Sequence, residues 1–205
     1  MAQTALRTTD RYFAFRSPVS AAEYLREELG AATKSEFVDG HVFAMAGTTD
    51  WHNMVALNLL SALNAALPDH CRALGLDVKL QIKTQTTERY YYADAFVSCG
   101  GQLTGSHVHT DAIVVAEVLS ETTERFDRGE KMLGYRFLPS LEDYLLIYPN
   151  IPCVEHYKRA EGWALTLVEN RETLLLPSIG VAVPLSDLYR RVPVTFRETS
   201  QSGQT

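Results

Sequence analysis

Two acidic residues stand in stretches that otherwise read as buried strands. Glu117 interrupts the apolar run 112–119, and Asp94 lies inside the largely apolar segment 91–97. A buried carboxylate is costly unless a cation, a hydrogen-bond network or a metal compensates it. If the two strands are neighbours, both carboxylates can converge on a hard divalent cation such as Mg²⁺. Such a site suits phosphoester hydrolysis, because the cation polarises the phosphate, stabilises the leaving oxygen and helps ionise the attacking water.

A structural interpretation of these carboxylates is open as well, since one could cap a turn and the other could pair with an arginine or lysine of the core. The charged, helix-prone segment 122–137 bears on the choice. Helical spacing places Asp127, Lys131 and Tyr135 on one face, from which the lysine could reach back toward the carboxylate of the apolar run. The alternative for this helix is a solvated i,i+4 ion pair that contributes little.

The hydrophobic pattern predicts the elements that would position these groups. Ser20 and Glu23 are typical of a helix start, and Asp39-Gly40 between two alternating runs predicts a tight hairpin. A helix is expected over 51–67, where apolar residues recur at helical spacing before Pro68. Strands are expected over 72–97, 112–119, 144–148, 154–158 and 163–168. The pattern indicates a mixed α/β (α+β) fold with a mixed sheet flanked by helices, an N-terminal hairpin and additional C-terminal strands.

Length and composition indicate one folded domain. The chain has 205 residues, of which 46% are hydrophobic and 21% charged. We expect a single domain over 17–193, with flexible segments at 1–16 and 194–205. The net charge of −6 excludes binding of nucleic acid through bulk positive charge, so a nucleic-acid partner would need a local basic groove. The candidates for that groove lie on or beside the strands that lead to the first carboxylate: Arg72, Lys79, Lys83 and Arg89.

The cysteines and histidines give weaker signals. Cys71, Cys99 and Cys153 are odd in number and widely spaced, so the sequence indicates neither a disulfide framework nor a zinc site, and a reducing cytoplasm fits best. No thiol nucleophile is indicated beside His70, and the run 107–109 reads as a surface loop. The sequence contains no GxGxxG, GxxxxGK[ST], HExxH or GxSxG motif. We also expect no signal peptide and no membrane span.

The order of several short motifs resembles that of a known family. These motifs are Glu36-Phe37-Val38-Asp39-Gly40, His52, Tyr91-Tyr92-Ala93-Asp94, Glu117-Val118-Leu119-Ser120, Asp127-Arg128-Gly129-Glu130-Lys131, Tyr135 and 139–146. Over about residues 23–188 the chain resembles the Uma-two family of restriction-endonuclease-like proteins, part of the PD-(D/E)XK nuclease superfamily. The resemblance implies a restriction-endonuclease-like core with a metal site at the sheet.

The same resemblance implies roles for particular residues. Asp94 and Glu117 match the two acidic metal ligands of the superfamily motif, and the metal would be Mg²⁺ or Mn²⁺. The motif's lysine would follow two residues after Glu117, where this chain has Leu119. In this family the lysine corresponds instead to Lys131 on the next helix, where it would orient the attacking water and stabilise charge on the phosphate.

Four further residues match positions around that site. Glu36 would be an additional acidic group, His52 a contact for phosphate or water, and Asp127 and Tyr135 would position the lysine. The chain departs from the superfamily pattern at Ala93, where proline is usual. A second departure is Glu121, also at a position where proline is common in the family, which makes the junction after the apolar strand more acidic.

The leading hypothesis is a cytoplasmic, homodimeric DNA endonuclease, a hydrolase that cleaves phosphodiester bonds with Mg²⁺ or Mn²⁺. The alternative is a nuclease fold without catalysis that serves as a nucleic-acid-binding or protein-interaction module, which the acidic balance and the two departures favour. A third hypothesis is a metal hydrolase that acts on a small phosphorylated substrate. The dimer is expected by analogy, since cleavage of both strands needs two sites.

Overall fold

The computed structural model describes residues 18–100, 103 and 105–197. The expected flexible segment 1–16 and residues 198–205 of the expected tail lie outside this range, whereas Val194 and Phe196 pack against the core. The helices and strands follow in the order α1 (Ala21–Glu28), β1 (Ser35–Val38), β2 (His41–Ala44), α2 (Asp50–Ala66), β3 (Cys71–Leu74), β4 (Lys79–Lys83), β5 (Glu88–Tyr91), β6 (Ala95–Cys99), β7 (Val108–His109), β8 (Val114–Val118), α3 (Glu124–Phe126), a π turn (Asp127–Lys131), α4 (Met132–Tyr135), β9 (Asp143–Ile147), β10 (Cys153–Lys158), a 3₁₀ turn (Arg159–Glu161), β11 (Leu165–Glu169), β12 (Thr173–Leu176), β13 (Val181–Pro184) and α5 (Leu185–Leu188).

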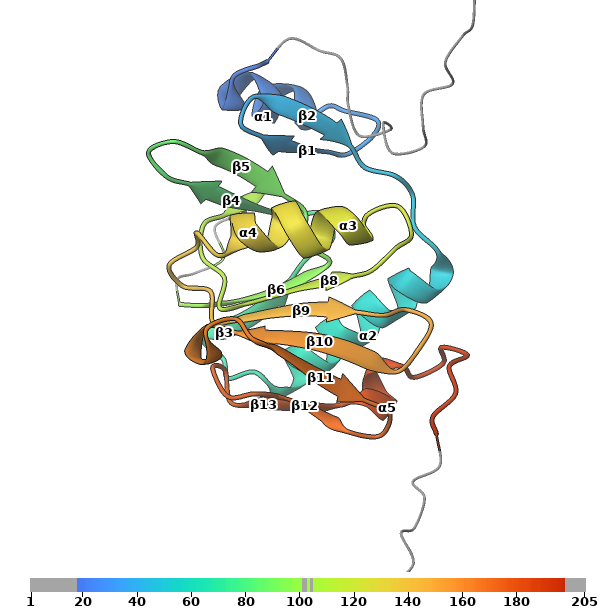
Figure 1. Cartoon of the computed structure of the whole chain (residues 1–205). Coiled ribbons are helices and arrows are strands. Elements are labelled where there is room, and N and C mark those ends of the chain that lie inside the picture. Colours follow the sequence, from blue (N-terminus) through green and yellow to red (C-terminus); the bar gives the residue numbers. More distant parts are fainter. Residues whose placement is uncertain (1–17, 101–102, 104, 198–205) are drawn as a thin grey trace, which may run out of the picture.

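The strands form three sheets. One has the order β2-β1-β5-β4-β7, a second has the order β11-β10-β9-β8-β6-β3, and β12 pairs with β13. The two larger sheets are mixed, because β4 and β7 are parallel, as are β8 and β9. The segment from α3 to α4 lies between these two sheets, and α2 lies on the opposite face of the six-stranded sheet (Figure 1). The expected mixed α/β fold is confirmed, with its strands divided among several sheets.

Local sequence signals account for several element boundaries. The side chain of Ser20 caps α1, and Thr49 caps α2 by accepting a hydrogen bond from the backbone of His52. The expected hairpin turns at Asp39 and Gly40, whose φ angles of 48° and 94° are those of a type I′ turn. Within the described residues, no helix combines the length and apolar character that a bilayer crossing requires.

Strand β8 runs through the centre of the molecule, as its apolar sequence predicts. All five of its residues are buried. Val114, Ala116 and Val118 face the cluster that includes α2, whereas Val115 packs with residues from the α3–α4 side. Because side chains alternate along a strand, Glu117 shares the face of Val115 and points toward the α3–α4 segment. The sheet therefore presents this carboxylate to the helix that carries the expected lysine.

The cysteine prediction was wrong in one respect. Cys71 and Cys99 form a disulfide between directly paired positions of β3 and β6, with their Cα atoms 4.0 Å apart. The two residues are 28 positions apart in sequence, and only the strand pairing brings them within bonding range. The inference of a reducing compartment rested on unpaired cysteines, so the disulfide removes its basis. Cys153 is a buried free cysteine.

Gly75 lets the end of β3 approach the backbone that carries the first acidic residue. A Cβ atom at this position would overlap the carbonyl oxygen of Asp94 and lie 3.0 Å from its carbonyl carbon. We expect Gly75→Ala to lower the free energy of unfolding by about 1–3 kcal/mol, because backbone must move to admit the methyl group. Urea denaturation checks this. Gly30→Ala is the control, since nothing lies within 4 Å of its Cβ, and an equal effect of both would contradict the prediction.

Candidate active site

The two strand carboxylates lie side by side, as predicted for neighbouring strands. Ala95 of β6 pairs with Ala116 of antiparallel β8, and the same register continued by one residue places Asp94 opposite Glu117. Asp94 precedes β6 at a bend, where its Oδ2 accepts a hydrogen bond of 2.7 Å from the backbone N–H of Val118. The bond fixes the Asp94 carboxylate at the end of β8.

Lys131 reaches back from the helical segment into this site. Its ammonium Nζ lies 2.9 Å from Oε1 of Glu36, 3.2 Å from Oε1 of Glu117 and 3.7 Å from Oδ1 of Asp127. The side chains of the lysine and of these three carboxylates are all buried, with exposures of 7% or less. The interpretation of Asp127 and Lys131 as a solvated pair was therefore wrong. The four residues come from β1, β8 and the π turn, which only the fold brings together.

The π turn lies where the helical segment faces the sheet. The N–H of Met132 reaches the carbonyl of Asp127, which also accepts a hydrogen bond of 2.9 Å from the hydroxyl of Tyr144. Tyr135 follows on α4 and donates a hydrogen bond of 2.8 Å to Oε1 of Glu117. Tyr135 and Lys131 thus donate hydrogen bonds to the same oxygen of Glu117. Tyr144 was not singled out, because its only signal was a tyrosine in an apolar strand.

In the cluster, several carboxyl groups surround a single ammonium. Burial raises the pKa of Glu117 well above its usual value, and Asp127, Asp94 and Glu36 add to the rise while Lys131 opposes it. Burial likewise raises the pKa of Glu36 and of Asp127. Burial alone would lower the pKa of Lys131, but the surrounding carboxylates outweigh it and raise that pKa well above normal. One ammonium is shared by several carboxylates and stays protonated.

His52 lies on the first turn of α2, next to Asp94. Its Nε2 is 3.3 Å from Oδ2 of Asp94. Burial tends to lower the pKa of His52, but the hydrogen bond and charge of Asp94 outweigh that effect and raise it. Among the described residues, Nδ1 of this ring has no hydrogen-bond partner although it is buried. The histidine therefore contacts the carboxylate of Asp94 from α2.

The donor set of the cluster fits a hard divalent cation. Carboxylate oxygens are the ligands that Mg²⁺ and Mn²⁺ prefer, and a bound cation would favour the ionised form of these buried carboxyl groups. The hydrogen bonds described above engage Oδ2 of Asp94 and Oε1 of Glu117. In the part of the chain that the structure describes, no three Asp, Glu, His or Cys side chains form a ready metal cage.

Two of the four residues expected to line a basic groove, Lys79 and Arg89, are largely buried and lie against carboxylates. Lys79 is buried, with its ammonium 4.3 Å from the ring centre of Tyr92 and 3.9 Å from a carboxylate oxygen of Glu28. Arg89 is largely buried and pairs with Glu130 at 2.7 Å. Of these predicted phosphate contacts, only Lys83 is mostly exposed, at 62% of its side chain. The alternation along β4 could not reveal that the rings of Tyr24 and Tyr92 lie against Lys79.

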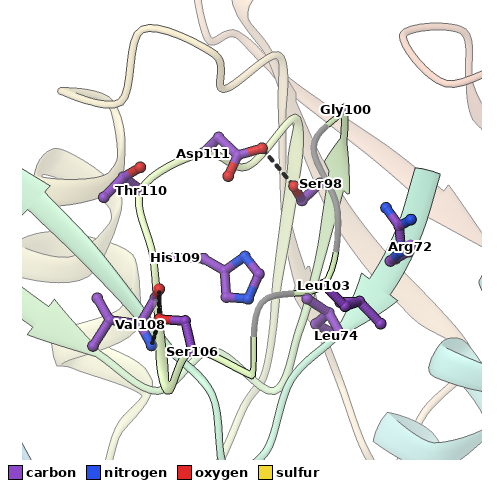
Figure 2. Close-up of a pocket in the computed structure, with 10 residues that line it drawn as sticks. All are labelled: Arg72, Leu74, Ser98, Gly100, Leu103, Ser106, Val108, His109, Thr110 and Asp111. Carbon is purple, nitrogen blue, oxygen red and sulfur yellow. Dashed lines mark hydrogen bonds between the residues drawn. The ribbon is translucent and has the colours of Figure 1, made fainter. Parts of the chain in front are cut away.

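A pocket of about 200 Å³ lies away from the acidic cluster, toward the other end of β6 (Figure 2). Arg72 and Ser98 line it from paired positions of β3 and β6, and Ser98 donates a hydrogen bond to Asp111. His109 also lines it, from β7, which pairs with β4. The prediction that the run 107–109 is a plain surface loop was therefore wrong for its last two residues, which form a strand.

Comparisons with known proteins identify the family of this chain and support its fold. The family model described as "Uma2: Putative restriction endonuclease" matches residues 21–186. The chain is 34% identical over 162 residues to "Uncharacterized protein sll1609" of Synechocystis sp., covering 75% of this chain and 90% of that protein. It is 31% identical over 176 residues to "Uncharacterized protein slr1290" of the same organism, covering 84% and 92%.

A solved structure extends the likeness to the fold. It is a crystal structure of "a putative nuclease belonging to DUF820" from Anabaena variabilis, with a TM-score of 0.68 and 17% sequence identity. The match covers 84% of this chain and 98% of that one. This likeness supports the restriction-endonuclease-like fold that the motifs imply. Because the family model spans most of the chain and all the site residues discussed above, the chain belongs to the Uma2 family of restriction-endonuclease-like proteins.

Proposed function

We propose that the protein is a nuclease that hydrolyses phosphodiester bonds of DNA with Mg²⁺ or Mn²⁺. The observation that carries the proposal is the paired position of Asp94 and Glu117, with Lys131 bound to Glu117 in a buried cluster rich in carboxyl groups. A cation held by these two carboxylates would act as a Lewis acid on the phosphate and help ionise a water. Membership in the Uma2 family supports nuclease chemistry.

The protein's own side chains would divide the remaining work. Lys131 would donate hydrogen bonds to the attacking water or to a phosphate oxygen, and its raised pKa keeps it a donor at neutral pH. Glu36 holds the lysine, and Tyr135 fixes Oε1 of Glu117. His52 holds Oδ2 of Asp94 and would contact the scissile phosphate from the α2 side. Each positioning contact comes from a different element of the fold.

A non-catalytic nucleic-acid-binding or protein-interaction module is the second candidate. The engaged state of Lys79 and Arg89 favours the protein-interaction form of this candidate, since both DNA cleavage and DNA binding need cations that can meet phosphates. Cleavage of both DNA strands would in turn need two active sites, which a homodimer would provide. The two candidates differ in whether bound DNA is cut.

Direct titration with Mn²⁺ tests the metal site without a choice of substrate. We expect saturable binding to the wild type, at least a tenfold weaker affinity in Asp94→Asn, and unchanged binding in Asp69→Asn, an exposed control. Equal affinity in the wild type and Asp94→Asn would contradict the assignment of this ligand. In a companion assay with DNA and Mn²⁺, DNA binding without strand cleavage would favour the non-catalytic module.

A further inference from the structure

Arg128 lies inside the π turn, between the two residues that the turn delivers to the active site. Its Nη1 forms an ion pair with Oε2 of Glu155 on β10, and its Nη2 donates a hydrogen bond of 2.8 Å to the hydroxyl of Tyr148. Its Nε donates a hydrogen bond of 2.9 Å to Glu124, one turn earlier. The guanidinium therefore connects the helical segment to β10 of the six-stranded sheet. Glu36, a partner of Lys131, lies on β1 of the other large sheet.

The receiving carboxylate is itself fixed. Glu155 is 5% exposed, and its two oxygens also accept hydrogen bonds of 2.8 Å from the hydroxyls of Tyr148 and Tyr157. Burial would raise the pKa of Glu155, but Arg128 and the two tyrosines outweigh it and lower that pKa. The carboxylate is therefore charged at neutral pH. A planar guanidinium bound to a buried, oriented carboxylate is a geometrically specific anchor.

We propose that Arg128 is a positioning residue, which ties the π turn to Glu155 and thereby holds Asp127 and Lys131 against Glu117. A second contact acts at the same turn, where the Tyr144 hydroxyl binds the carbonyl of Asp127. Contacts with Tyr144 on β9 and Glu155 on β10 therefore fix the π turn at two places. Asp127 and Lys131 lie in this turn, so the same contacts fix their positions. The catalytic consequence rests on the proposed function, whereas the placement of Lys131 does not.

Two variants, Arg128→Gln and Glu155→Gln, test the inference. Nitrogen-15 NMR of the lysine ammonium groups reports the environment of Lys131, whose signal is assigned by its absence in Lys131→Arg. We expect that signal to shift or broaden in both variants of the anchor. We also expect kcat for Mn²⁺-dependent DNA cleavage to fall about tenfold or more, with KM within about twofold, as for outer-shell residues of metal sites.

The controls separate positioning from plain stability. Glu161→Gln removes a carboxylate from an exposed ion pair with Lys158, near the end of β10, and should leave the Lys131 signal and kcat unchanged. Arg128→Lys keeps the charge but loses the forked geometry, so it should restore part of the lost kcat. An unchanged Lys131 signal in both Arg128→Gln and Glu155→Gln would overturn the inference, even if both melt earlier. If the wild type does not cut DNA, the proposed function fails, and the NMR signal still decides the role of Arg128.

Discussion

Replacing Lys131 by methionine is expected to lower the free energy of unfolding by about 3–5 kcal/mol at pH 8. The methionine fills a similar volume but leaves the carboxylates of Glu36, Glu117 and Asp127 buried without their shared cation. Removing one partner of a buried ionic cluster costs more than the cluster contributes, because the remaining charges cannot regain water. Urea denaturation of wild type and variant measures the difference.

The same variant should lose less stability at pH 5 than at pH 8. Burial already raises the pKa of all three carboxyl groups in the wild type, and loss of the ammonium raises it further. The folded variant then binds protons that the unfolded chain, with ordinary pKa values, has released. Its stability therefore falls as the pH rises from the unfolded to the folded pKa, and acid restores it.

Lys158→Met is the matched control for this prediction. Lys158 pairs with Glu161 near the surface, at 25% and 48% side-chain exposure, so its removal should change stability by less than about 1 kcal/mol. A loss of that small size in Lys131→Met, or an equal loss at pH 5 and pH 8, would show that the three carboxylates do not depend on the lysine.

Local chemistry explains which parts of the fold the sequence predicts. Asp39-Gly40 specifies its turn because those two residue types tolerate positive φ, and Ser20 marks the start of α1 because a short polar side chain can cap it. The division of strands between sheets has no such local signal. The same holds for the Cys71–Cys99 disulfide, which depends on the antiparallel pairing of β3 with β6.

The candidate site divides in the same way. Glu117 could be found because a charge inside an apolar strand is costly, and Lys131 because helical spacing aligns it with Asp127. Arg128 and Tyr144 could not be found, because their partners are set by the approach of a helix to β9 and β10. Lys79 was misjudged for the same reason, since Tyr92 covers it from outside its own strand.

Glu117→Gln is expected to reduce Mn²⁺-dependent DNA cleavage on the order of a thousandfold, equivalent to about 4 kcal/mol of transition-state stabilisation. The amide keeps the size of the carboxylate, and its oxygen can still accept the hydrogen bond from Tyr135. What it loses is the negative charge that would hold the cation opposite Asp94. Single-turnover cleavage, with saturating protein, separates this effect from weaker DNA binding.

The fold should survive this change, which makes the loss of activity interpretable. Burial raises the pKa of Glu117, so the ionised carboxylate costs folding free energy at neutral pH, and a neutral side chain removes that cost. We therefore expect the melting temperature of Glu117→Gln to match or exceed that of the wild type. Glu88→Gln, on β5 and outside the cluster, should cut DNA within about twofold of the wild-type rate. If folded Glu117→Gln cleaves DNA at the wild-type rate, the Glu117 carboxylate has no role in catalysis, because no charge is then needed opposite Asp94.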